Sequence, residues 1–169
     1  VSWTGTGSAA TIGHGLSQTP QMIIVKNRDK SSQWGTYTET TGANNYLALN
    51  DADAVASYSG YFPNVPTSTV FSVGTDGDIS GGSGQDVIAY CFHSVKGFSK
   101  MGSYTGNGST DGTFVYTGFR PAFVMVKRTD ASAHWRMFDN KREGYNVDND
   151  ALKANATDAE TTTDFIDLL

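Results

Sequence analysis

Two tryptophans in this chain are preceded by an aspartate at the same spacing. Trp34 lies five residues after Asp29, and Trp135 lies five residues after Asp130. An indole face stacks on the C–H groups of a pyranose, and a nearby carboxylate accepts hydrogen bonds from sugar hydroxyls. The spacing predicts either paired carbohydrate sites or core tryptophans whose aspartates hold the preceding turn. We favour the core interpretation, because repeated positions more often encode a fold than a ligand.

Three further aspartates could hold a metal ion. Asp76 and Asp78 flank a glycine, and Asp86 follows in the same Gly-rich region. Hard cations such as Ca²⁺ prefer several convergent oxygens, but the spacing lacks the alternation and the terminal glutamate of an EF-hand loop. We expect a solvated turn here, assign no metal site and predict no cofactor.

The residue types used most often in acid–base catalysis do not form a pattern. His14, His93 and His134 occupy no matching positions in the repeat described below, whereas a duplicated catalytic site would leave matched histidines. A Gly-x-Ser-x-Gly elbow leading into a helix is also missing from the sequence. We therefore assign no catalytic residue and predict a protein that is not an enzyme. A polysaccharide depolymerase would need two or three carboxylates in one cleft, and the acidic residues here are scattered through loops.

The sequence segments that contain the aspartate and the tryptophan occur twice in the chain. Residues 3–8, 20–26 and 29–34 return as residues 104–109, 121–127 and 130–135, all at an offset of 101. The match resumes at Leu47 with Leu152, at an offset of 105, and again at residues 67–71 with 161–165, at an offset of 94. The second copy thus lacks eleven residues in the region around residues 57–66. Such a repeat indicates a tandem array of small modules, which we place at residues 1–99 and 100–169. Duplicated modules more often bind or build than catalyse.

The second copy is shorter than the first after the Phe71–Phe165 match. The first copy continues for 28 residues to Ser99, whereas the second has only four. The strand expected at residues 87–95 therefore has no counterpart, and the second module is predicted to lack its closing strands. Exposed sheet surface of this kind needs a cover, which continuation of the natural chain past Leu169 or another chain would supply. We favour continuation.

Short apolar segments bounded by Gly, Asn, Asp, Ser and Thr predict strands throughout. Residues 22–25, 87–95 and 123–126 are apolar on both faces, as in central strands. The other expected strands are residues 33–37, 46–49, 69–73 and 113–116. Residues 150–155 could form a helix, but their counterpart around Leu47 is strand-like. The predicted fold is all-β, with tandem antiparallel β-sandwich (jelly-roll-like) modules and the second incomplete.

The composition excludes several classes of partner. Lys and Arg total 12 against 17 Asp and Glu, a formal net charge of −5, which argues against nucleic-acid binding. Cys91 is the only cysteine, so an intrachain disulfide and a cysteine-rich zinc site are excluded. No apolar run approaches the length of a membrane helix, so we predict no membrane insertion.

Two long strings resemble a known type of module. Ile12-Gly-His-Gly-Leu16, followed by residues 20–29 and Trp34, is similar to a repeat in virion and tail-fibre-like structural proteins of marine tailed phages, cyanophages especially. Residues 102–109 with 118–130 resemble it too. A weaker similarity, at the level of fold, is to H-type lectin sandwiches, in which a proline also precedes a strand with the pattern Val-x-Val.

The phage resemblance implies a structural component of the virion, in a tail fibre or another exposed appendage. The implied partners are other virion proteins or copies of this chain in a homo-oligomer, for which a trimer suits a fibre, together with a host-surface glycan. The alternative is a lectin-like module that binds carbohydrate through Trp34, Asp29, Trp135 and Asp130.

Overall fold

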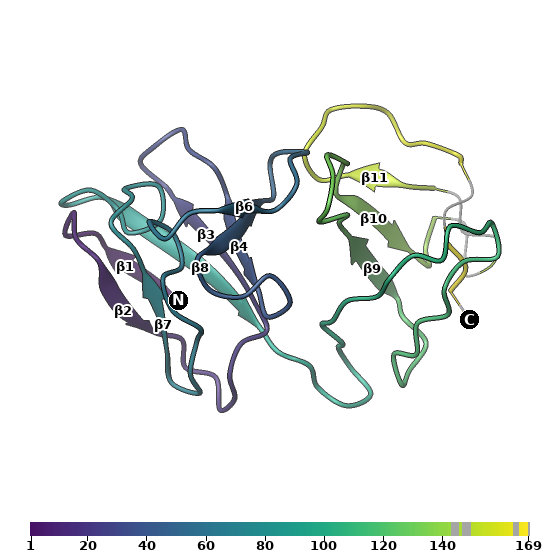
Figure 1. Ribbon diagram of the computed structural model, residues 1–169, viewed down its shortest axis with the longest axis horizontal. Helices are drawn as coiled ribbons and strands as arrows, with labels where there is room; N and C mark the ends of the chain where they lie inside the picture. Colours follow the sequence, from purple (N-terminus) through teal and green to yellow (C-terminus); the bar gives the residue numbers. More distant parts are fainter. Residues whose placement is uncertain (143–145, 147–149, 164–165, 169) are drawn as a thin grey trace.

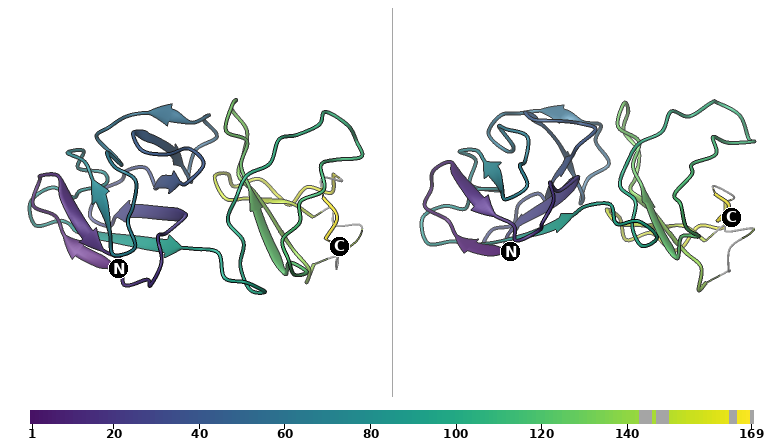
Figure 2. Two further views of the ribbon diagram at one scale, coloured as in Figure 1. Left: turned by 60° about the horizontal axis from the view of Figure 1, so that its bottom comes forward. Right: turned by 90° about the horizontal axis from the view of Figure 1, so that it is seen from below.

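The computed structural model describes residues 1–142, 146, 150–163 and 166–168. This part of the chain contains eleven strands and no helix, and every strand pair is antiparallel. The predicted all-β sandwich fold is confirmed. In Figures 1 and 2 the residues of the first copy (1–99) and those of the second copy (100–169) form two bodies, side by side along the long axis. The described residues include no helix that could span a membrane.

The first copy contains a large sheet and a small one. The large sheet has the strand order β1-β8-β3-β4-β5-β6, and the small sheet pairs β2 with β7. The strands are β1 (Ser2–Thr4), β2 (Ala10–Gly13), β3 (Met22–Asn27), β4 (Gly35–Thr38), β5 (Asn45–Ala48), β6 (Ala56–Ser57), β7 (Val70–Val73) and β8 (Asp86–Phe92).

The two sheets of the first copy enclose one core. Successive side chains of a strand point to opposite faces, so Ile23 and Val25 of β3 share a face and both are fully buried. They belong to one apolar cluster with Phe71 and Val73 of β7, which come from the opposite sheet. The first copy is therefore a two-layer sandwich.

Gly35 shows how tightly the layers meet. A side chain at this position would collide with Ile79 and would press on the ring of Tyr61. Glycine is the residue that lets these two side chains sit directly on the sheet, because it has no Cβ.

The second copy repeats the centre of the large sheet. Strands β9 (Phe123–Val126), β10 (Arg136–Asp139) and β11 (Leu152–Lys153) form a sheet of order β11-β10-β9. Their registers equal those of β3, β4 and β5 position by position. Gly35 lies opposite Ala48, and at the matching place Arg136 lies opposite Lys153. The rejected helix at residues 150–155 is indeed a short strand and turn.

The repeat in space also corrects one detail of the sequence match. Thr161 forms a bridge with Ala151, as Ala56 pairs with Tyr46 in the first copy. Thr161 thus takes the place of Ala56, and the deletion in the second copy falls later in the chain than the sequence match indicated. Phe165, the proposed counterpart of Phe71, lies outside the described residues.

One expected strand was wrong, and four strands lie outside the expected ranges. Residues 113–116 are not in a strand, and Phe114 and Tyr116 are 73% and 78% exposed. Their counterpart in the first copy, residues 12–15, overlaps the end of β2, which pairs with β7. The described part of the second copy contains no strand in the place of β7. These strands are β1, β2, β6 and β10, and each is only two to four residues long. The boundary at residue 99 remains a prediction.

Candidate functional site

The first copy has a polar groove of about 540 Å³ on its surface. Four segments that are distant in sequence meet there: the β3–β4 hairpin, the end of β5, the loop after β6 and the loop after β7. The lining residues are Ser31, Ser32, Gln33, Tyr46, Asn50, Tyr58, Tyr61, Asp76 and Asp78. Main-chain hydrogen bonds join the last two segments, from Gly74 to Tyr61 at 2.8 Å and from Asp76 to Gly60 at 3.1 Å.

Three tyrosines form the aromatic part of the groove. The ring centroids of Tyr46 and Tyr61 are 4.3 Å apart, and those of Tyr58 and Tyr61 are 5.4 Å apart in an edge-to-face arrangement. Tyr61 is 4% exposed, whereas Tyr58 is 45% exposed. Tyr61 is therefore the buried support, and Tyr58 offers a ring to solvent.

The two aspartates of the groove hold the tyrosine hydroxyls. The hydroxyl of Tyr58 donates to Oδ2 of Asp76 at 3.2 Å, and that of Tyr61 donates to Oδ2 of Asp78 at 3.3 Å. Burial, followed by the negative charges of Asp78 and Asp76, raises the pKa of Tyr61 far above its usual value near 10. The hydroxyl thus stays protonated and remains a donor.

A lysine closes one side of this carboxylate pair. Lys30 Nζ lies 2.5 Å from Oδ1 of Asp78, and this contact raises the pKa of the Lys30 amine. The other oxygens of Asp76 accept hydrogen bonds from the turn that follows, including the amide of Asp78 at 2.8 Å. The groove therefore presents hydroxyl, amide and carboxylate groups beside an aromatic ring, which suits a ligand with many hydroxyl groups.

Trp34 and Asp29 lie close to this groove but do not line it. Trp34 is half-buried, and its amide donates to Oδ1 of Asn50, a groove residue, at 2.8 Å. Asp29 accepts a hydrogen bond from the amide of Asp86 at 2.6 Å, so it fixes the start of β8 rather than its own turn. That turn is held instead by Asn27, whose Oδ1 accepts from the amide of Asp29.

Trp135 is placed differently from Trp34. It is 3% exposed, and its indole N–H donates to the carbonyl of Ala48 in the first copy at 2.9 Å. Asp130 lies in solvent and pairs with Arg128 at 2.6 Å. The indole faces of Trp135 are therefore inaccessible in this arrangement, and the two members of the second predicted carbohydrate pair lie in different surroundings from Trp34 and Asp29.

The three metal candidates are separated by the fold. Asp76 and Asp78 belong to the groove, whereas Asp86 begins β8 and accepts a hydrogen bond from the hydroxyl of Thr4 at 3.3 Å. No group of three or more His, Cys, Asp or Glu side chains suited to a metal ion occurs in the part of the chain that the structure describes.

The histidines and the cysteine also lie apart. His14 is 5% exposed and is held by the carbonyl of Thr67 at 3.1 Å, while His93 contacts the carbonyl of Ser94 and His134 contacts Asn155. Cys91 is partly buried on β8, and burial raises the pKa of its thiol.

The sequence analysis missed Tyr46, Tyr58 and Tyr61 as site residues. Signals for them existed separately: an aromatic segment present only in the first copy, and an Asp-Gly-Asp turn. The chain does not show before folding that these two segments meet.

Comparison with known families gives one match. A family described as a domain of unknown function, DUF7483, matches residues 1–169. No curated protein and no solved structure matches the chain. Since the family match spans all of the residues, the chain belongs to the DUF7483 family.

Proposed function

We propose that this protein is a non-enzymatic structural module of a larger assembly, in accord with the expected place in an exposed appendage of a phage particle. The observation that carries the proposal is the use made of the repeated tryptophan. In the second copy it is buried against the first copy, with its indole N–H on the carbonyl of Ala48. A residue kept at the same place in both copies here joins modules.

Two main-chain hydrogen bonds also join the copies. The amide of Val55 donates to the carbonyl of Thr129 at 2.9 Å, and the amide of Ala133 donates to the carbonyl of Ala52 at 2.8 Å. Main-chain bonds fix the orientation of one module on the next, because the backbone has little freedom once its strands are paired. A fixed orientation is what a spacer in an appendage needs.

Small-angle X-ray scattering on the full chain tests the rigid-spacer role. We expect a scattering curve that one fixed arrangement of the two copies reproduces, and Trp135→Ala should make the particle longer and flexible. Trp34→Ala is the matched control and should leave the curve unchanged at low protein concentration. A wild-type chain that already scatters as two freely moving bodies would contradict the proposal.

Immunogold labelling tests the place in the particle. Antibodies raised against this chain should label an appendage of intact phage particles from a source that encodes it. Label confined to lysed host cells, with bare particles, would contradict a virion role.

The groove of the first copy supports a second candidate function, the binding of a host-surface glycan. The specific observation is the exposed ring of Tyr58 beside Asp76, Asn50 and Gln33, in a groove whose aromatic segment is special to the first copy. This candidate replaces the paired-site version, because it needs one site and not two.

Titration of the labelled chain with neutral oligosaccharides, followed by NMR, tests glycan binding. Resonances of groove residues should shift, and Tyr58→Ala should weaken binding about tenfold or more, since stacking on one ring contributes about 1–2 kcal/mol. Tyr116→Ala, a change of a 78% exposed tyrosine outside the groove, is the control. Chemical-shift changes of the same size in the Tyr58→Ala variant would contradict glycan binding in the groove.

A further inference from the structure

The contact between the two copies is formed by two short segments, and each segment occurs twice in the chain. The docking hairpin is the turn between the first two repeated strands with its flanks, residues 26–34 in the first copy and 127–135 in the second. The docking edge follows the third repeated strand, residues 48–55 in the first copy and 153–160 in the second. In the structure, the hairpin of the second copy lies on the edge of the first.

Three side chains of the hairpin take part in this contact, together with the two main-chain bonds given above. Lys127 Nζ donates to the carbonyl of Ala52 at 3.2 Å, and Ser132 Oγ donates to Oδ1 of Asp53 at 3.4 Å. Trp135 donates to the carbonyl of Ala48. Burial lowers the pKa of Lys127, as expected for an amine held in an interface.

The side chains that make these bonds are the same in both copies. Lys26, Ser31 and Trp34 stand where Lys127, Ser132 and Trp135 stand. Asp158 likewise stands in the place of Asp53. The remaining acceptors on the edge are carbonyl oxygens, which any residue supplies.

The backbone that presents these groups is also the same in both copies. The bond that orients the hairpin runs from the amide of Trp34 to Asn50 at 2.8 Å, and from the amide of Trp135 to Asn155 at 3.0 Å. The turn of the docking edge is closed by Tyr46 with Ala56 in the first copy and by Ala151 with Thr161 in the second. Each copy therefore carries both halves of the contact.

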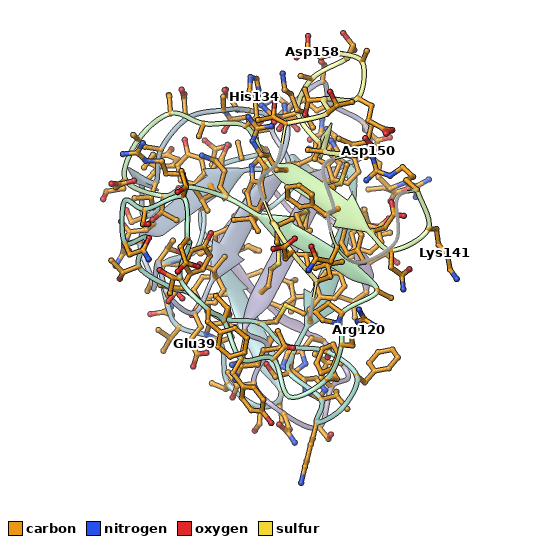
Figure 3. All side chains as sticks on the ribbon, turned by 90° about the vertical axis from the view of Figure 1, so that its right-hand side faces the viewer. Glu39, Arg120, His134, Lys141, Asp150 and Asp158 are labelled. Carbon is orange, nitrogen blue, oxygen red and sulfur yellow. The ribbon has the colours of Figure 1, made fainter. Side chains whose placement is uncertain are left out.

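The contact within the chain uses one hairpin and one edge, which leaves one of each open. Within the described residues, no partner is seen for the indole N–H of Trp34, the amide of Ser32 or the carbonyl of Arg28. These atoms match the donors and the acceptor that the second copy uses. On the other side, residues 157–160 are exposed, and Figure 3 shows Asp158 at the outer edge of the end formed by the second copy.

The open edge also has an apolar neighbour that differs in burial between the copies. Leu47, next to the occupied edge, is 2% exposed, whereas its counterpart Leu152, next to the open edge, is 37% exposed. A hairpin seated at residues 153–160 would bring its tryptophan to the carbonyl directly after Leu152, as Trp135 lies at the carbonyl of Ala48, directly after Leu47. Burial of such a side chain stabilises a contact by about 1 kcal/mol or more.

The charges of the open hairpin and the open edge are opposite. The hairpin carries Lys26, Arg28 and Lys30 against Asp29, a net charge of +2, and the edge carries Asp158 and Glu160 against Lys153, a net charge of −1. Asp158 is paired with Lys153 of its own copy at 2.6 Å. The occupied contact has the same polarity, because Lys127 faces the negative charges of Asp53 and Asp51. Complementary charge of this kind selects the partner and the orientation.

We propose that the docking hairpin at residues 26–34 binds the docking edge at residues 153–160 of a second copy of this chain, through the contacts already made between the two copies within one chain. This contact deepens the proposed structural role and rests on it. A contact between two different surfaces does not close on itself in a dimer, so repeated use gives a ring or an open row of modules. In such a row every docking hairpin except the first is buried.

Cysteine cross-linking tests the proposal on the full chain. Ser31→Cys with Asp158→Cys, in a Cys91→Ser background, places one thiol on the open hairpin and one on the open edge. A short bifunctional thiol reagent should give a ladder of covalent multimers on a denaturing gel. Trp34→Ala should reduce the cross-linked fraction about tenfold, as loss of a central tryptophan does in other interfaces.

Two matched pairs make each outcome decisive. Ser132→Cys with Asp53→Cys should cross-link within one chain and so stay monomeric in mass, because Ser132 Oγ and Asp53 Oδ1 are 3.4 Å apart. Ser31→Cys with Asp111→Cys should give no ladder. If the intrachain pair closes and the Ser31–Asp158 pair stays monomeric, the head-to-tail contact is overturned while the module contact stands. If the Ser132–Asp53 pair also fails to cross-link, the contact within the chain and the contact between chains are both overturned. Ladders of equal intensity from the Ser31–Asp111 pair would show unspecific collision and would overturn the contact between chains.

Discussion

The first and second copies share three strands in the same register, yet only the first copy is a complete sandwich. In the first copy β7 and β8 pair with β2 and β1, and the two layers enclose Phe71, Val87 and Ile23. The described part of the second copy has no counterpart of any of these four strands. Residues 113–116 are strand-like in sequence and still stay irregular. A short segment of this kind becomes a strand only where its partner is present.

The same difference explains two substitutions between the copies. Gly35 must be a glycine because Ile79 and Tyr61 press on it, and the matching residue in the second copy is Arg136. Trp3 packs edge-on against Phe71 at 6.0 Å and donates to the carbonyl of Ser80, whereas its counterpart Tyr104 is 53% exposed. Positions that meet the second layer in the first copy therefore carry different residue types in the second.

The largest expected effect comes from emptying the enclosed core. Phe71→Ala should lower the free energy of unfolding by about 3–5 kcal/mol, because a fully buried ring is replaced by a cavity. Phe114→Ala, a change at a 73% exposed ring of the second copy, should alter it by no more than about 0.5 kcal/mol. Urea unfolding followed by circular dichroism measures both. Similar losses of unfolding free energy in the two variants would contradict an enclosed core in the first copy alone.

Substitution of Gly35 tests the contact between the two layers of the first copy, with a smaller expected effect. Gly35→Ala should cost about 1–3 kcal/mol, because its Cβ must displace Ile79 or Tyr61. Arg136→Ala at the matched position should cost less. Thermal unfolding by calorimetry compares the two, and an Arg136 variant that is the less stable of the pair would contradict the picture of an open second copy.

The two tryptophans sharpen the comparison at the level of one hydrogen bond. Trp135→Phe should cost about 1–2 kcal/mol, because a buried donor to Ala48 is lost. Trp34→Phe should change stability by about 0.5 kcal/mol or less in dilute solution, where its indole N–H faces solvent. Denaturant unfolding followed by the fluorescence of the two remaining tryptophans separates the two variants.

The smallest expected effect concerns alkaline pH. Burial, and then the charges of Asp78 and Asp76, raise the pKa of Tyr61 above the value near 10 that it has when unfolded. The folded state therefore holds this proton more tightly, and its contribution is present below pH 10 and is lost as the pH rises beyond it. Stability measured between pH 9 and 11 should fall less steeply in Tyr61→Phe than in the wild type. Parallel curves would contradict a buried, protonated Tyr61.

Much of the shared sheet could be predicted from the sequence, and the reasons are physical. β3 and β9 contain continuous apolar runs after a proline, and the gapless repeat joins each to a tryptophan directly before the next strand. β1, β2 and β6 could not be predicted, because they are short and polar and depend on distant partners. Gly5, for example, donates to the carbonyl of Gln85 at 2.7 Å.

The sites were harder to predict than the strands. Trp34 and Trp135 have the same sequence surroundings, and only the packing of one copy on the other makes them different. In the groove, Tyr58 donates a hydrogen bond to Asp76, and Gly74 packs closely against the carbonyl of Gly60. No sequence pattern links these two segments before the chain folds.

Residue-resolved amide hydrogen exchange on the full chain tests the central claim, that one sheet is built twice and enclosed once. The account predicts the slowest exchange in β3 (Met22–Asn27) and β8 (Asp86–Phe92), faster but still protected exchange in β9 (Phe123–Val126), and no protection at residues 113–117. Equal protection of β3 and β9 would show a single indivisible core and would contradict the account.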